Sequence, residues 1–191
     1  MTWQRVAHSI IARPQLAGLH SHLRRKLDLF NVNVLPGRRV ARALWVMQNL
    51  ARLTPPRVSV AYLRTITNGW MTAGRFQAQQ PCRFGCRHGK DTLLHCLKCP
   101  VAGRWRYKHA RLRSPPGSLL LEHSLIMGAD TLDGRWLAEA AATNDAVLSA
   151  RGRHLYALYR THNALRYRSI CVKDAQNAYK GFLMDCRSAD P

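Results

Sequence analysis

The sequence predicts a mainly α-helical protein in which a small metal-binding loop and helix are embedded, with little or no sheet. In several segments, apolar residues recur three and four positions apart, which is the period of an amphipathic helix. No segment alternates apolar and polar residues over a useful strand length. Four of the six cysteines fall between positions 82 and 99, and such a cluster is typical of a structural metal site.

The charge is distributed unevenly along the chain. The 191 residues carry a formal net charge of +20, and residues 1–113 contribute +19 of it because their 21 Lys+Arg face only Asp28 and Asp91. Residues 114–191 hold nine basic and eight acidic residues. We therefore expect a basic helical region at 1–113, containing the metal-binding segment at about 81–105, and a near-neutral helical region at 114–191 that packs on it. The Ser-Pro-Pro-Gly sequence at 114–117 marks the boundary.

Composition also indicates the class of partner. A strongly positive field attracts polyanions, so RNA or DNA is the expected partner and an acidic protein is the alternative. The 47% hydrophobic content is enough for a packed core, and no apolar run approaches the ~20 residues of a membrane span, so no membrane contact is expected. An intracellular, nuclear location fits best; the acid-poor N-terminal segment leaves a mitochondrial transit peptide open. The sequence does not indicate an oligomeric state.

Proline and glycine mark most helix ends. Pro55 and Pro56 separate two helices, and Asn68-Gly69 ends the second of them. In the C-terminal part, His162 lies on an apolar stripe and is interpreted as a core histidine rather than a ligand. The sequence predicts helices at about 16–30, 38–53, 57–67, 91–99, 101–113, 118–127, 135–143, 153–168 and 171–186, with helical spacing also at Trp3, Val6 and Ile10.

The metal-binding segment combines a loop with a helix. Cys82 and Cys86 form a Cys-x3-Cys knuckle that contains Gly85, a residue that permits the left-handed backbone such turns need. His95 and Cys99 follow at i and i+4, which places them on one helical face. Three cysteines and one histidine form a closed tetrahedral set suited to structural Zn2+.

Other residues of the segment compete for the site. Cys96 with Cys99 would give a four-cysteine site, and His88 could replace His95. Asp91 is expected to be the N-cap of the helix, and Pro100 is expected to end it. Its buried side is expected to consist of Leu93, Leu94 and Leu97.

The motif resembles a known family. The order of residues is similar to that in the zinc-binding segment downstream of the reverse transcriptase domain in non-LTR (LINE-type) retrotransposons. It runs Cys-x3-Cys, a polar stretch, Asp-Thr-Leu-Leu-His, three residues and Cys-Pro. The resemblance covers about residues 57–105. It departs from the family in placing Cys96 directly after His95 and only three residues between His95 and Cys99. The resemblance implies a C-terminal fragment that lacks the polymerase and helps to position template RNA or target DNA.

Basic residues crowd around this segment. In the sequence, Trp70 and Phe76 flank Arg75, and a basic residue between aromatic residues can form a stacking platform for single-stranded nucleic acid. The alternative is that both rings pack onto the small metal unit. The candidates for contacts to the nucleic-acid backbone are Arg75, Arg83, Arg87, Lys90, Lys98, Arg104, Arg106 and Lys108.

The sequence lacks the carboxylate patterns of the related enzymes. Two adjacent metal-binding aspartates of a polymerase are missing, and the basic region holds too few acids for a two-metal site. The nuclease candidates Asp130, Asp133 and Glu139 have no lysine at the Asp/Glu-x-Lys spacing. We therefore expect binding without catalysis; a structural or interaction domain, a decayed element remnant and, more remotely, a nuclease are the alternatives.

Overall fold

The structure is a computed structural model that describes residues 17–28, 30, 36–87, 89–110, 145–167 and 171–186. Several predictions lie outside the described residues. They concern the N-terminal helical spacing and transit peptide, the boundary at 114–117, the helices at 118–127 and 135–143, the alternate ligand His88 and the nuclease candidates Asp130, Asp133 and Glu139.

The fold is mainly helical, as predicted, and the described residues contain no strand. Pro81 and Lys90 form an isolated antiparallel bridge at the base of the metal-binding loop. The elements in chain order are α2 (Ala17–Asp28), α3 (Pro36–Leu53), α4 (Pro56–Ile66), the 3-10 turn η2 (Ala73–Phe76), α5 (Leu93–Lys98), α6 (Pro100–Trp105), the π-helical turn η3 (Arg106–Ala110), α9 (Asp145–Leu165) and α10 (Val172–Asp185). No described helix has the length and apolarity needed to cross a bilayer.

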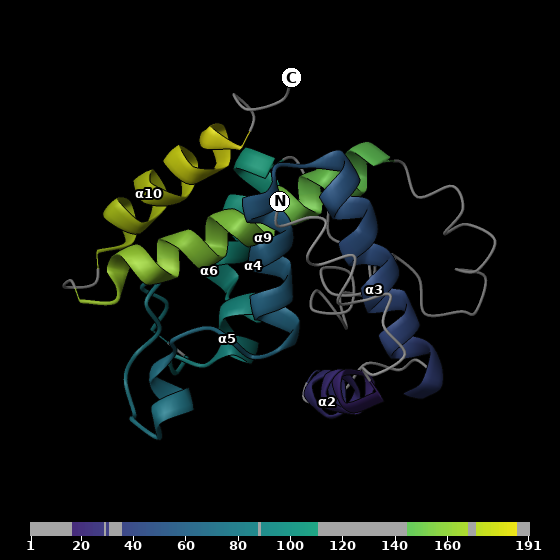
Figure 1. Cartoon of the computed structure of the whole chain (residues 1–191). Coiled ribbons are helices and arrows are strands. Elements are labelled where there is room, and N and C mark those ends of the chain that lie inside the picture. Colours follow the sequence, from purple (N-terminus) through teal and green to yellow (C-terminus); the bar gives the residue numbers. More distant parts are fainter. Residues whose placement is uncertain are drawn as a thin grey trace.

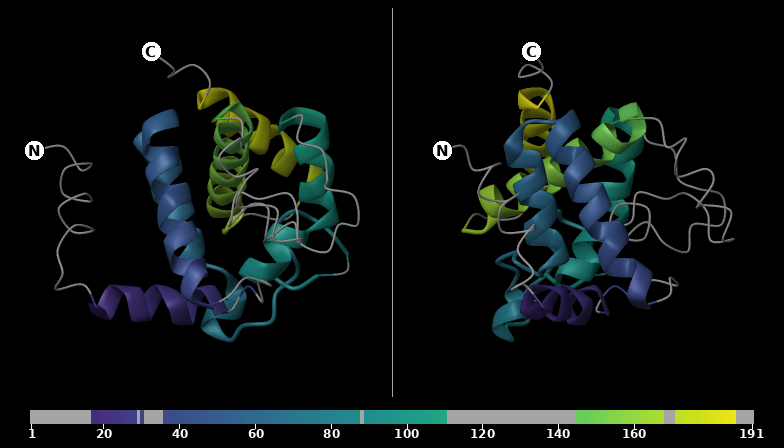
Figure 2. Two further views of the ribbon diagram at one scale, coloured as in Figure 1. Left: turned by 90° about the vertical axis from the view of Figure 1, so that its right-hand side faces the viewer. Right: turned by 45° about the vertical axis from the view of Figure 1, so that its right-hand side comes forward.

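Helix α9 runs through the middle of the molecule (Figure 1) and packs against α3, α4 and α10. Helix α2 lies across the lower end of α3 in both views of Figure 2. One continuous core includes apolar residues from α2, α3, α4, the metal-binding segment, α9 and α10. The near-neutral C-terminal helices therefore share a core with the basic N-terminal ones.

The helix faces follow the 3.6-residue period of the apolar residues. In α4, Val58, Ala61, Tyr62 and Ile66 are all buried. In α3 the buried line runs through Val40, Ala43, Val46 and Leu50. In α5 the predicted burial of Leu93 and Leu97 is confirmed, but that of Leu94 is wrong because its side chain is 38% exposed.

Helix α9 begins eight residues before the predicted start at 153. Although glycine weakens a helix, Gly152 lies inside α9 in the structure. A Cβ at this position would lie 2.5 Å from Leu50 Cδ2 and 3.0 Å from Val58 Cγ1. The glycine is therefore the point of close approach where α9 crosses α3 and α4.

His154 of α9 is buried in the core, where its Nδ1 lies 2.6 Å from the Tyr179 hydroxyl of α10. Burial and, to a smaller extent, the nearby Arg106 lower the pKa of His154 to about 3. The folded protein therefore holds this imidazole neutral at pH 7.

Acid is expected to destabilise the fold through His154. In the unfolded state the imidazole takes up a proton below its ordinary pKa of 6.5, whereas in the folded state it does so only near pH 3. As the pH is lowered from 6.5 to 3, the free energy of unfolding therefore decreases by up to ~1.4 kcal/mol per pH unit. His154→Gln retains a hydrogen-bonding group that does not titrate. Urea denaturation of both proteins at pH 7.5 and 5.5 measures the difference; equal losses of stability would contradict the prediction.

Candidate metal centre

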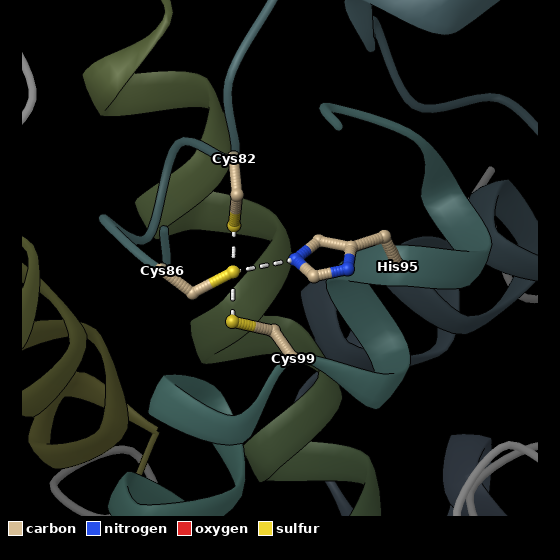
Figure 3. A group of neighbouring side chains, drawn as sticks. All are labelled: Cys82, Cys86, His95 and Cys99. Atoms are coloured by element: carbon tan, nitrogen blue, oxygen red, sulfur yellow. Dashed lines mark hydrogen bonds between the residues drawn. The ribbon is translucent and has the colours of Figure 1, made fainter. Parts of the chain in front are cut away.

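Four side chains predicted as ligands converge on one point (Figure 3). Their ligand atoms, the Sγ of Cys82, Cys86 and Cys99 and a ring nitrogen of His95, all lie within 4.8 Å of one another. Cys82 Sγ is 3.7 Å from Cys99 Sγ, and Cys86 Sγ is 3.0 Å from His95 Nε2. Two sulfurs bound tetrahedrally to zinc at ~2.3 Å would be ~3.8 Å apart, so the cysteine pair is spaced for an ion of this kind.

The loop that carries Cys82 and Cys86 is closed by its own backbone. The N–H of Cys82 donates to the carbonyl of Gly89, and the N–H of Gly85 donates to the carbonyl of Cys82. Gly85 has φ 79°, a left-handed conformation in which other residues are strained. The glycine predicted to shape the knuckle therefore does so by turning both sulfurs to the same side.

A second glycine makes room for the histidine ligand. A Cβ built on Gly89 would lie 1.8 Å from His95 Cε1 and 2.2 Å from Nε2. Such distances are far below van der Waals contact, so the imidazole occupies the space that a side chain at position 89 would fill. Gly89 thus supports the site without contributing a ligand atom.

Gly89→Ala is expected to weaken metal binding by about 10- to 100-fold, the range seen when the support of a ligand is removed. The methyl group displaces the His95 ring from the three sulfurs. Competition with a chromophoric chelator measures the affinity. Gly103→Ala on α6, where a Cβ meets nothing within 4 Å, is the matched control. The prediction fails if the two variants bind the metal equally well.

Cys99 lies at the junction of two short helices. It follows α5 and precedes α6, whose first residue is Pro100, so the proline begins a helix as well as ending one. A hydrogen bond from Cys82 and the backbone N–H groups of Ala102 and Val101 lower the pKa of Cys99 to about 5. The same pairing, together with burial, raises the pKa of Cys82. Thiolates are the form that binds metals. The lowered pKa therefore favours the thiolate form of Cys99 at neutral pH.

The prediction that Asp91 caps the metal-site helix is wrong. Thr92 is the N-cap, and its Oγ1 accepts a hydrogen bond from the His95 N–H at 3.2 Å. The Asp91 carboxylate is instead turned into the core, only 2% exposed. Its Oδ2 accepts from the Ala73 N–H at 2.8 Å, and its Oδ1 lies 2.8 Å from His162 Nε2. Asp91 therefore connects the metal-binding segment to η2 and to α9.

This connection keeps Asp91 ionised. Burial alone would raise the pKa of the carboxyl, but the hydrogen bonds from His162 and the Ala73 N–H, together with the nearby Arg83, lower it. Nε of Arg83 lies 3.9 Å from Asp91 Oδ2. His162 is fully buried and hydrogen-bonded, so its interpretation as a core histidine agrees with its position in the structure.

Cys96, the alternate ligand, does not belong to the group of four ligand atoms. It is completely buried, and its Sγ lies 3.9 Å from Asp91 Oδ1. Burial and the neighbouring carboxylate raise the pKa of this thiol. Asp91, Cys96 and His162 form a second close group, in which the aspartate Oδ1 and His162 Nε2 lie 2.8 Å apart. The structure thus groups His95, and not Cys96, with the other three ligands.

Aromatic rings fill the space between the metal-binding loop and α9. The Phe84 ring, fully buried in the loop, lies edge-on to Trp105 at 5.5 Å and to His162 at 6.4 Å. Trp70 lies 5.5 Å from His162 and 5.6 Å from Tyr159. These contacts secure the small loop to the main core.

Two residues predicted at the nucleic-acid interface lie inside the protein. Trp70 is fully buried and its Nε1 donates to Thr65 Oγ1 at 2.9 Å, so the prediction that it stacks on bases is wrong. Arg106 is only 5% exposed because the π-helical turn directs it toward the core near His154. Arg83 is mostly covered and is held by Gln80 and Asp91.

The other predicted contacts are on the surface. Phe76 is 58% exposed, as base stacking requires. The exposed basic candidates are Arg75, Arg87, Lys90, Lys98, Arg104 and Lys108.

Sequence reasoning missed Tyr107. Its ring is 70% exposed between Arg104 and Lys108, the same arrangement of aromatic and basic residues that drew attention to Phe76. The Arg-Trp-Arg-Tyr-Lys sequence at 104–108 contained this pattern, but the helical period alone does not show which of the two rings faces outward.

Fold and site together define a mainly helical protein with a Cys3His cluster that could hold a metal ion. Searches with the sequence and the structure against family models, curated proteins and solved structures give no match.

Proposed function

We propose that the chain is a zinc-stabilised nucleic-acid-binding module that binds RNA or DNA through the backbone and without catalysis. The observation that carries the proposal is the convergence of Cys82, Cys86, His95 and Cys99. Three sulfurs and one imidazole are the donor set of structural zinc, and they leave no position open for a substrate. Zn2+ would hold the loop and α5 together; the binding surface is formed by other residues.

The exposed cations around the cluster support the choice of partner. Arg104 and Lys108 are one turn apart and both exposed, with Tyr107 between them. Arginine and lysine neutralise phosphates, and an exposed ring offers bases a stacking surface. The resemblance of residues 57–105 to the zinc-binding segment of non-LTR retrotransposons favours the same partner.

Binding to an acidic protein is the second candidate, because the same cations would serve it. The two partners differ in two respects. Nucleic acid binding releases condensed counterions in proportion to the phosphates neutralised, and it includes base stacking, whereas an acidic protein presents no stacked bases at Phe76 or Tyr107.

The proposal is tested on the purified 191-residue chain. Native mass spectrometry should find one zinc ion per chain. Binding to a single-stranded RNA and a DNA of equal length should weaken steeply between 50 and 200 mM salt. Arg104→Gln with Lys108→Gln should reduce the slope of log K against log salt by about 1.4 to 1.8, while Arg104→Lys with Lys108→Arg should leave it unchanged. A metal-free folded protein, or equal slopes in the two double variants, would contradict the proposal.

A further inference from the structure

A cavity of about 180 Å³ opens between η2, the end of α4 and the metal-site helix α5. Its walls are mainly apolar and include Phe30, Leu93 and Leu94, while Asn68, Thr72 and Arg75 add polar groups. The volume corresponds to about six water molecules and is below the ~300–1,000 Å³ of drug-sized sites. It suits one flat ring system rather than an entire cofactor.

Two polar side chains at this cavity have no partner among the residues that the structure describes. Among the described residues, neither the Asn68 amide nor the Arg75 guanidinium makes a hydrogen bond or ion pair. Asn68 has φ 54°, a left-handed conformation just after the end of α4, where the residue lines the cavity. An amide can pair with the hydrogen-bonding edge of a base, and an exposed guanidinium can bind the adjoining phosphate.

We propose that this cavity binds one unstacked base of a single-stranded nucleic acid. The base would enter between the apolar walls, with its edge toward Asn68 and its phosphate at Arg75. The charge of the chain selects this occupant over an uncharged ligand, since the cavity belongs to the region that carries +19. The inference rests on the proposed nucleic-acid binding and specifies which strand form is recognised.

The cavity is built partly on the metal-site helix. Thr92, the N-cap of α5, and Leu94 both line it. On the opposite wall, Gly74 donates its N–H to the Asp91 carbonyl, and a Cβ at Gly74 would lie 2.8 Å from Thr92 Cγ2. A metal ion bound at the four-ligand cluster would therefore also support the walls that would enclose the base.

The test compares two probes with the same number of phosphates, a 12-nucleotide oligoadenylate and an abasic backbone of equal length, at fixed salt. The 191-residue chain should bind the base-containing strand about tenfold more tightly, since stacking contributes ~1–3 kcal/mol per base. Asn68→Gly tolerates the left-handed backbone. It should bring the ratio of the two affinities, base-containing over abasic, close to one. Leu94→Ala, which shortens one wall at a partly exposed position, should lower the ratio as well.

Arg104→Gln is the control, and it should weaken binding of both strands equally. A ratio of one in the unchanged protein would overturn the cavity proposal while leaving backbone binding intact. A ratio that neither variant lowers would also overturn it and assign the stacking to exposed rings such as Phe76 and Tyr107. Failure to bind either strand would remove the proposed function itself, and displacement of the bases by an acidic, tyrosine-containing peptide would assign the cavity to a protein partner.

Discussion

Replacing both Cys82 and Cys86 by serine is expected to release the metal ion and to unfold the segment around residues 81–105. These two sulfurs form half of the four-ligand cluster. Structural zinc contributes ~10–16 kcal/mol of binding free energy in zinc-finger peptides at pH 7, which is comparable to the ~5–15 kcal/mol stability of a whole domain. The loss should spread to the aromatic contacts of Phe84 with Trp105 and His162.

Native mass spectrometry and thermal denaturation followed by circular dichroism measure the two effects. Cys171→Ser is the control, because this cysteine is exposed and belongs to neither close group of ligand atoms. A chelator added to the unchanged protein should reproduce the effect of the double variant. If the double variant melts like the control, the cluster does not stabilise the fold.

Asp91→Ala is expected to be the most damaging single change outside the ligands. It removes the acceptor of both the Ala73 N–H and His162 Nε2, in a place where His162 is fully buried. Removing one member of a buried pair typically costs ~3–5 kcal/mol, since the remaining group is left without its partner. The metal-binding loop should then separate from α9 more readily while the four ligands are all still present.

Hydrogen exchange of the backbone amides in α5 and α9, with urea denaturation, measures this loosening. Asp28→Ala is the matched control. Asp28 pairs with Arg39 at 2.8 Å, but its side chain is 52% exposed, so the loss should be at most ~1 kcal/mol. Equal effects of the two substitutions would show that the buried carboxylate contributes no more than a surface one.

Local patterns predicted much of this structure because they follow local rules. The faces of α4 were readable from the 3.6-residue period. The i, i+4 spacing of His95 and Cys99 was sufficient to place both beside the knuckle, even though α5 ends before Cys99. Covalent geometry and one helical turn determine such relations.

Relations between distant parts of the chain could not be read in this way. Asp91 and His162 are 71 positions apart. From the neighbouring residues alone, Asp91 could therefore be assigned only the role of an N-cap. The close approach of Leu50 and Val58 to Gly152 comes from other helices, so the residues around Gly152 do not reveal it. The burial of Trp70 likewise depends on α9, whose position the sequence does not state.

The contacts of the metal-binding segment with His162 have a consequence for folding while the chain is being synthesised. The four metal ligands leave the ribosome well before α9, which begins at Asp145. Until α9 is synthesised, Phe84 and Trp70 lack the His162 ring that they contact in the finished fold. During that interval the nascent segment exposes apolar rings next to thiols, so early metal capture would protect it from both oxidation and aggregation.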